Sequence, residues 1–316
     1  MNQYVLAECC IEMINSAILM MFLYSNFVST EFEESTEYYE RIAWGRYVYE
    51  EGAYPFFLSI QIPRGGNPRN GYHHNCGGSL IEPRIMLTAA HCLMNDTLIP
   101  LIRILPNYRN TPLILPRDLV FKIEAYEKHP HYGSVPWLTA KDDIAVVLLD
   151  KPHPQPGAII FRPVLPLHIC FPVKMMGYGA TESGDPPYRL REATVFRLDD
   201  EDCLDEAPWR FVPGYSLCVI NGVGSAGCLG DSGGPLIWEN PKTNKTFIYG
   251  VVSIVFLHCA DAPLTIFVDV LAYNDWIDIA VFRLSLHDEL RSGLETKLIF
   301  GYHLKIGLSL WIGFHT

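Results

Sequence analysis

The sequence predicts an all-β protein. From about Tyr54 onward, short apolar or alternating runs are separated by clusters of Pro, Gly and Asn, which is the pattern of strands joined by tight turns. The clearest runs cover residues 56–60, 85–88, 144–149 and 249–255. No helical pattern alternates with these runs, so a barrel or a sandwich is favoured over a parallel sheet.

One helix is expected near the end of the chain, over residues 269–282. Apolar side chains recur there at helical spacing, so one face can pack on the core. The residues of that face are Val270, Tyr273, Trp276 and Ile277. An apolar stretch follows at 298–314, but His303, Lys305 and three glycines argue against a bilayer span. We assign no role to the extension 278–316.

The overall composition is that of an ordinary globular protein. The chain has 316 residues, of which 49% are hydrophobic and 19% are charged, so it can form a full core. Its formal net charge is −11. A protein with this charge offers no basic surface for phosphates, and we therefore expect no nucleic-acid partner.

The N-terminal region predicts a signal peptide over residues 1–30. Residues 14–28 form an apolar run of suitable length, and small residues and the acidic stretch 31–41 follow it. Met13 is an alternative start of the chain. A membrane anchor is the competing interpretation, because the apolar run approaches the ~18-residue lower limit of a spanning helix.

Cysteines and glycosylation sequons indicate the same compartment. The chain has nine cysteines, which cluster around the motifs described below and favour disulfides over a reduced set. Sequons begin at Asn95 (Asn-Asp-Thr) and Asn244 (Asn-Lys-Thr). We therefore expect a secreted, extracellular glycoprotein.

The strongest local motif is the Gly-rich segment 227–236 (GCLGDSGGPL), which displays Ser232. A serine hydroxyl becomes a useful nucleophile only beside a base, and backbone N–H groups must face the developing oxyanion. The absence of a side chain at Gly230 allows the backbone to approach a substrate closely. An ordinary surface turn is the alternative interpretation.

Two further strings carry a candidate base and a candidate carboxylate. His91 ends the string LTAAHC, directly before Cys92, and Asp143 opens the apolar run that follows Asp142. A buried carboxylate at that position needs a partner such as an imidazole N–H. Taken singly, the two residues could equally be a structural histidine and a strand-capping aspartate.

Together, His91, Asp143 and Ser232 occur in the order and local contexts of the trypsin and chymotrypsin family of serine proteases, which this chain resembles over about 42–277. The resemblance implies two perpendicular six-stranded antiparallel β-barrels that divide near residue 160, with the active site between them. The expected organisation is a signal peptide (1–30), a short propeptide (31–41), the protease domain (42–277) and the extension (278–316).

The resemblance also implies the chemistry of a serine endopeptidase. His91 is the expected general base, Asp143 orients its ring, and Ser232 attacks the scissile carbonyl. The backbone N–H groups of Gly230 and Ser232 are the expected oxyanion hole. Asp142 is expected to be a solvated neighbour, because the family pattern Asp-Ile-Ala begins at Asp143.

Arg41 and Ile42 resemble the family's activation site. Cleavage after Arg41 by an activating protease would free the ammonium of Ile42 to pair with Asp231, so the chain is expected to be a zymogen. Trp44 departs from the family, which usually has a small residue there, and the segment before Tyr54 is one residue longer. Cleavage after Arg46 is the alternative.

The resemblance implies a disulfide pattern as well. The implied pairs are Cys76–Cys92, Cys203–Cys218 and Cys228–Cys259. Cys170 is left without an obvious partner, and we expect it to be a free thiol or an intermolecular link.

Residues that align with the family's primary pocket indicate a preference for small aliphatic side chains. Ala226 stands at the base, where an aspartate would select Arg or Lys. Val255 and Thr265 stand at the walls beside Ser253, an arrangement similar to that of elastases. If the chain's insertion falls differently, Leu264 replaces Thr265 and still narrows the pocket.

We expect no cofactor and no metal site. The pairs His73–His74 and His129–His131 lack a cysteine or carboxylate at ligand spacing. The expected partners are protein or peptide substrates, an activating protease and protein inhibitors. A non-catalytic homologue that only binds partners is the main alternative function, and a membrane-tethered protease is an alternative location.

Overall fold

The computed structural model describes most of the central part of the chain. The described residues are 45–50, 52–106, 119–133, 139–155, 157–180, 189–220, 227–255 and 264–291. The expected signal peptide and propeptide lie outside them, as do the site residues Arg41, Ile42, Ala226 and Cys259.

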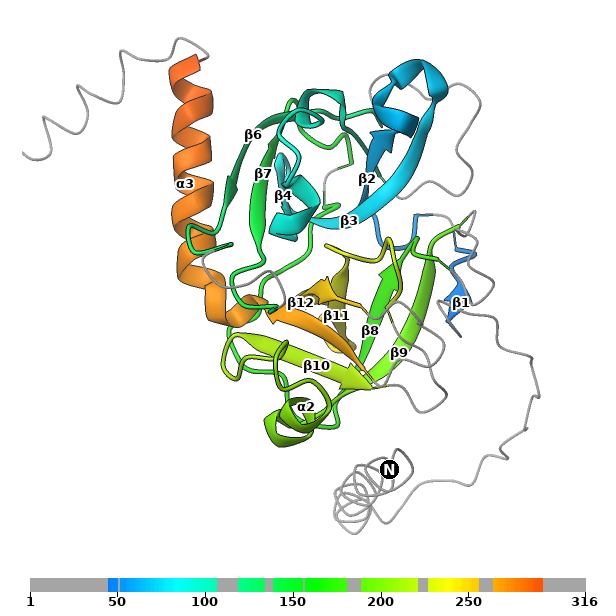
Figure 1. Ribbon diagram of the computed structural model, residues 1–316, viewed down its shortest axis with the longest axis vertical. Coiled ribbons are helices and arrows are strands. Elements are labelled where there is room, and N and C mark those ends of the chain that lie inside the picture. The colour runs from blue at the N-terminus through cyan, green and yellow to red at the C-terminus, as the bar shows by residue number, and fades with distance from the viewer. Residues whose placement is uncertain are drawn as a thin grey trace, which may run out of the picture.

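The first half of the described chain forms an antiparallel sheet of six strands in the order β5-β2-β3-β4-β7-β6 (Figure 1). Its strands are β2 (Phe57–Pro63), β3 (Tyr72–Glu82), β4 (Ile85–Thr88), β5 (Arg103–Pro106), β6 (Ile123–Lys128) and β7 (Ala145–Leu149). Strands β4 and β7 are buried along their whole length, in keeping with their almost wholly apolar sequences, and the one polar side chain, Thr88, donates to the Gly77 carbonyl at 2.8 Å. An isolated bridge joins Ile104 on the edge strand β5 to Phe121, just before the other edge strand β6. The two edge strands themselves are not paired, so the described strands form a half-barrel.

The second half forms a closed antiparallel barrel, because β8 pairs with both β9 and β11. Its strands are β8 (Pro172–Gly177), β9 (Arg191–Arg197), β10 (Ser216–Ile220), β11 (Pro235–Asn240), β12 (Lys245–Ile254) and β13 (Thr265–Asp269). The short strand β1 (Arg46–Tyr47) pairs with the outer side of β9. The predicted all-β fold with two six-stranded antiparallel barrels is confirmed, and the described strands form one closed barrel and one half-barrel.

Helices are few in the described part of the chain. The helix α2 (Asp200–Glu206) starts at the N-cap Asp199, whose carboxylate accepts a hydrogen bond from the N–H of Asp202 at 2.8 Å. The short 3₁₀ turns are η1 (Arg64–Gly66), η2 (Pro68–Asn70), η3 (Ala90–Leu93), η4 (Ile99–Leu101) and η7 (Val270–Tyr273). Among the described residues, no helix has both the length and the apolarity needed to cross a bilayer.

The predicted C-terminal helix is present and is longer than the sequence pattern indicated. It runs through η7 into α3 (Asn274–Arg291), which lies along β6 and β7 of the first sheet (Figure 1). The apolar face continues to Leu284, which is buried, and Asp288 pairs with Arg84 at 2.5 Å. Residues 278–291, which we expected to belong to the extension, are therefore part of this packed helix.

The disulfides agree with the expected pairs wherever both partners are described. The expectation for Cys170, however, is not borne out. Sulfur–sulfur bonds join Cys76 to Cys92 and Cys203 to Cys218. Cys228 is disulfide-bonded, while its expected partner lies outside the described residues. Cys170 is also disulfide-bonded, so the expectation of a free thiol or an intermolecular link is wrong.

Candidate active site

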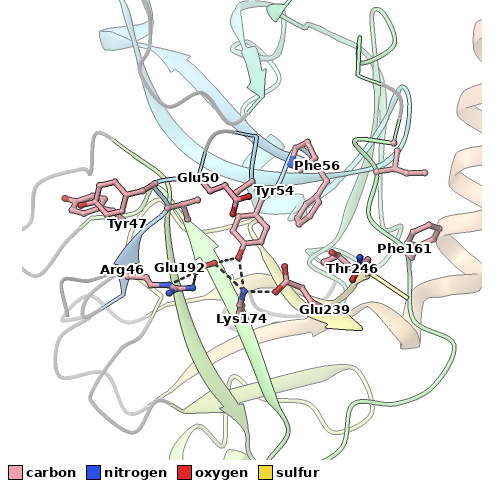
Figure 2. Close-up of a pocket in the computed structure, with 17 residues that line it drawn as sticks. Arg46, Tyr47, Glu50, Tyr54, Phe56, Phe161, Lys174, Glu192, Glu239 and Thr246 are labelled. Atoms are coloured by element: carbon pink, nitrogen blue, oxygen red, sulfur yellow. Dashed lines mark hydrogen bonds and ion pairs between the residues drawn. The ribbon is translucent and has the colours of Figure 1, made fainter. Parts of the chain in front are cut away.

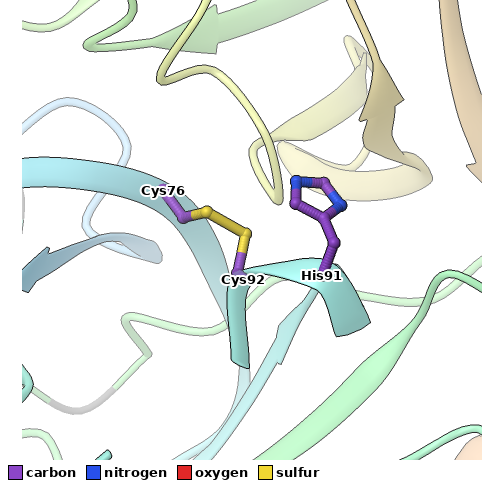
Figure 3. Close-up of side chains that lie close together, drawn as sticks. All are labelled: Cys76, His91 and Cys92. Atoms are coloured by element: carbon purple, nitrogen blue, oxygen red, sulfur yellow. A yellow bond between two sulfur atoms is a disulfide. The ribbon is translucent and has the colours of Figure 1, made fainter. Parts of the chain in front are cut away.

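His91 lies on η3, the turn that follows the buried strand β4. The neighbouring Cys92 is bonded to Cys76 on β3, which anchors this turn to the sheet (Figure 3). The His91 N–H donates to Asp143 Oδ1 at 2.8 Å, and Nδ1 lies 2.7 Å from Asp143 Oδ2. Because a carboxylate accepts, Nδ1 carries the proton and Nε2 is left as the basic nitrogen.

The electrostatic surroundings of His91 favour its role as a base. Burial lowers the pKa of the imidazole. The charge of Asp143 and the hydrogen bond to it raise that pKa by more than burial lowers it, so the pKa lies above the usual value. The His91 side chain is 28% exposed, whereas that of Asp143 is 5% exposed. The imidazole is thus accessible and its orienting carboxylate is shielded from water.

Asp143 has a third partner that the sequence interpretation did not assign to it. The Ser253 hydroxyl donates to Asp143 Oδ2 at 2.6 Å, so the buried carboxylate accepts three hydrogen bonds. We expected Ser253 only in the substrate pocket. Its position inside the apolar strand β12 was a usable signal, because a buried hydroxyl needs a partner.

Asp142 is buried, and the expectation that it would be a solvated neighbour is wrong. It is 3% exposed and has a positive φ of 64°. Its N–H donates to the Tyr273 hydroxyl at 2.8 Å, and that hydroxyl donates to Asp142 Oδ1 at 2.9 Å. The terminal helix therefore supplies the polar partner that burial demands, and only Asp143 contacts His91 among these two carboxylates.

Ser232 is held against the strand ends that carry His91. Its carbonyl accepts a hydrogen bond from Gly77 N–H on β3 at 2.7 Å. The next residue, Gly233, has a φ of 77°, and a Cβ there would overlap Thr88 Oγ1 and the Gly77 carbonyl. Because Thr88 ends β4 shortly before His91, this close packing brings the serine loop and the histidine turn together between the two sheets.

Asp231 is a buried carboxylate directly beside the serine. Its two oxygens accept hydrogen bonds from Gly179 N–H at 2.7 Å and Cys228 N–H at 2.8 Å. Burial raises its pKa to about 6, although these two hydrogen bonds and the charge of Arg191 act in the opposite direction. A Cβ at Gly179 would lie 2.5 Å from Asp231 Oδ2, so glycine is required for this approach.

His74 holds the peptide that precedes the serine loop, a contact that the sequence interpretation missed. Its Nε2–H donates to the Gly230 carbonyl at 2.8 Å, and Nδ1 accepts from the Ser59 hydroxyl at 2.8 Å. Burial lowers the pKa of His74 to about 4, so the ring is neutral and this tautomer is retained near neutral pH. Gly230, with φ of 102°, is thereby fixed in orientation.

Comparison with known families identifies this arrangement. A sequence model described as Trypsin matches residues 43–277, which include both sheets and every contact of the candidate site. The chain belongs to the trypsin family. Members of this family are usually serine endopeptidases, and the barrel, the half-barrel and the terminal helix are typical of its fold.

Three relatives illustrate how far the similarity extends. The chain is 30% identical to the ovochymase of Halocynthia roretzi over 240 residues, which are 72% of this chain and 14% of that protein. It is 30% identical to proproteinase E of Bos taurus over 244 residues, or 74% of this chain and 94% of that protein. It is 31% identical to granzyme M of Rattus norvegicus over 242 residues, which are 73% of this chain and 86% of that protein.

The two expected wall residues of the trypsin-family pocket come together in the structure. A Cβ at Gly227 would lie 2.9 Å from Thr265 Cγ2 and 3.0 Å from Val255 Cγ1, so both side chains face the same backbone. The Gly227 N–H donates to Thr265 Oγ1 at 2.7 Å. Leu264, the alternative wall residue, packs instead in a separate apolar cluster with Cys203.

Other parts of the trypsin-family domain are distinct from this site. Both sequon asparagines, Asn95 and Asn244, are exposed.

A cavity of about 1040 Å³ lies beside β1, where Lys174 contacts Glu239 at 2.6 Å and Arg46 contacts Glu192 at 2.5 Å (Figure 2). None of the predicted catalytic residues lines that cavity, so we do not assign it to the chemistry.

Proposed function

We propose that this trypsin-family chain is a secreted serine endopeptidase that is made as a zymogen and acts through an acyl-enzyme. The observation that carries the proposal is the hydrogen-bonded series Ser253–Asp143–His91, with the Ser232 loop packed against the same strand ends. A series of this kind orients one imidazole and leaves its second nitrogen basic.

In the proposed mechanism, His91 Nε2 accepts the Ser232 hydroxyl proton while Oγ attacks the scissile carbonyl. The N–H groups of Gly230 and Ser232 stabilise the oxyanion, a contribution of about 3 kcal/mol for each donor. His91 then donates the proton to the leaving amine, and water hydrolyses the acyl-enzyme by the reverse sequence. His74 binds the Gly230 carbonyl and so supports the neighbouring Gly230–Asp231 peptide.

The zymogen proposal rests on Asp231. This carboxylate is 1% exposed and its pKa is raised to about 6, so its ionised form is incompletely compensated. The Gly45 carbonyl accepts a hydrogen bond from Arg191, whose charge acts on Asp231. Cleavage after Arg41 would free the ammonium of Ile42, three residues before Gly45, and we propose that this ammonium pairs with Asp231.

Cleavage after small aliphatic residues such as Ala or Val is the proposed specificity. Val255 and Thr265 converge on Gly227, beside the expected pocket base Ala226. Side chains in these positions leave room for a short residue only, and Ala226 offers no carboxylate for Arg or Lys.

Extracellular localisation is supported by the disulfides and by the exposure of Asn95 and Asn244, which is what glycosylation requires. An activating protease, protein or peptide substrates and protein inhibitors are the proposed partners. The alternative remains a non-catalytic member of the family that uses the same fold for binding.

Labelling by a fluorophosphonate tests the catalytic proposal directly. The full chain is cleaved after Arg41 and incubated with the probe, and we expect one covalent adduct on Ser232. The uncleaved chain should label much more slowly, because its oxyanion peptide is not yet completed by the Ile42–Asp231 pair. A Ser232→Ala variant is the matched control and should not label. An unlabelled cleaved wild type would favour the non-catalytic alternative.

Peptide substrates that differ only in the residue before the cleaved bond test the specificity. We expect the wild type to prefer Ala and Val over Leu, Arg and Lys. A Val255→Gly variant removes one wall and should raise the Leu:Ala ratio of kcat/KM by about tenfold or more. Substrates with Arg should not gain, because Ala226 is unchanged. A wild type that cleaves best after Arg would show that these residues do not line the pocket.

A further inference from the structure

A cluster of two histidines and one carboxylate lies outside the proposed catalytic residues. His129 and His131 stand on the turn that follows β6, and Asp142 precedes β7. One potential ligand atom from each residue lies within 4.8 Å of the other two. The local sequence around the histidines offers no carboxylate at ligand spacing, but the pairing of β6 with β7 brings Asp142 to them.

The distances in this cluster suit a small tetrahedral metal ion. His129 Nδ1 lies 3.3 Å from Asp142 Oδ1. Two ligands that each lie about 2.0 to 2.1 Å from a tetrahedral Zn²⁺ are about 3.4 Å apart. One ligand atom of the exposed His131 lies within 4.8 Å of the other two ligand atoms, and exposure leaves its side chain free to turn towards them.

The two inner ligands are already held in place by their neighbours. The Tyr273 hydroxyl donates to Asp142 Oδ1 at 2.9 Å, a contact of the kind that orients metal-binding carboxylates. The His129 ring packs edge-on against Tyr273 and Trp276, with ring centroids 5.2 and 5.0 Å away. Its backbone N–H donates to the Ile144 carbonyl at 3.0 Å.

We propose that His129, His131 and Asp142 bind one Zn²⁺ ion, with water as the fourth ligand. Imidazole and carboxylate together suit zinc, whereas Ca²⁺ and Mg²⁺ prefer sites made of oxygen alone. The alternative is an ordinary His129–Asp142 contact, with His131 placed by the turn 129–132. In that turn the His131 N–H donates to His129 Nδ1 at 3.4 Å and the Tyr132 N–H donates to the His129 carbonyl at 2.9 Å. The titration below distinguishes this turn from a metal site.

Lys141 is the cation that acts on His129, and its own contacts reduce its effect on the site. Its ammonium lies 4.3 Å from the centroid of the Tyr215 ring, which gives the charge a partner of its own. The metal site is independent of the peptidase proposal, since none of its ligands belongs to the proposed triad.

Isothermal titration of Zn²⁺ into the untagged full chain tests the proposal. We expect one saturable ion per chain in the wild type, and at least about tenfold weaker binding in His131→Ala, which loses a ligand. His168→Ala is the matched control, because His168 is also an exposed histidine but lies outside the cluster, and its affinity should equal that of the wild type.

A second measurement uses Co²⁺, whose visible absorption reports coordination by nitrogen and oxygen ligands. We expect an intense tetrahedral spectrum in the wild type and in His168→Ala, and its loss in His131→Ala. Tyr273→Phe should keep the ligands and weaken Zn²⁺ binding by about tenfold, because the orienting hydroxyl is removed. Equal Zn²⁺ affinity in the wild type and His131→Ala would place the ion elsewhere and overturn the proposal, as would the absence of saturable binding.

Discussion

An Asp143→Asn variant is expected to lose about 10⁴-fold in kcat towards a peptide substrate. Both carboxylate oxygens of Asp143 accept, from the His91 N–H on one side and from His91 Nδ1–H and the Ser253 hydroxyl on the other. An asparagine amide has one acceptor oxygen and one donor nitrogen. In either orientation of the amide, its NH₂ group therefore faces an N–H or O–H donor that a carboxylate oxygen accepted from in the wild type. The imidazole is then driven towards the wrong tautomer, with Nε2 protonated and unable to accept from Ser232.

The same variant should also shift the pH dependence of the activity. Removing the charge of Asp143 removes the contribution that raises the pKa of His91, while burial, which lowers it, remains. Since the base must be neutral, the acid limb of kcat/KM should move to lower pH as the activity falls. Asp150→Asn, at the other end of β7, is the control and should behave as the wild type. A loss below tenfold, or an unmoved acid limb, would contradict the role of Asp143.

A Gly233→Ala variant should lower kcat/KM by about 10²-fold, the loss expected when a reacting group moves by about 1 Å. The new Cβ overlaps Thr88 Oγ1 and the Gly77 carbonyl, so the loop must move away from β3 and β4. That movement carries Ser232 away from His91.

Gly214→Ala separates this overlap from backbone strain. Gly214 has a φ of 76°, close to the 77° of Gly233, but a Cβ there meets nothing within 4 Å. Both variants should therefore lose the ~1–2 kcal/mol of stability that a left-handed alanine costs, as measured by denaturant unfolding. Only Gly233→Ala should lose activity. Equal activity in the two variants would show that close packing of the loop is unnecessary.

The family and the candidate triad were predictable because their signals are local. The strings around His91, Asp143 and Ser232 each combine a reactive side chain with the small or apolar neighbours that its position requires. The order of the three strings and the short apolar runs between them also predicted the all-β fold, which the strand pairing confirms. The terminal helix was predicted for the same reason, from the periodicity of a single segment.

The partners of buried polar groups were not predictable, because these partners come from distant segments. Ser253 reaches Asp143, Tyr273 reaches Asp142, and His74 reaches Gly230, each across a long stretch of chain. The full length of α3 was not predictable for a similar reason, because its last turns are stabilised by packing against the first sheet and by the pair of Asp288 with the distant Arg84.

The sequence by itself determined the family and the fold class and indicated the candidate reactive side chains, because these depend on residue types at short spacing. The resemblance already assigned Asp143 to His91, but only the tertiary structure showed that Asp142 is buried and contacts Tyr273 and His129. Asp142 and Asp143 are adjacent and chemically identical, and the direction of each is set by the hydrogen-bond donors that surround it in the fold. The same reason explains why the His129, His131 and Asp142 cluster becomes visible only when β6 and β7 are paired.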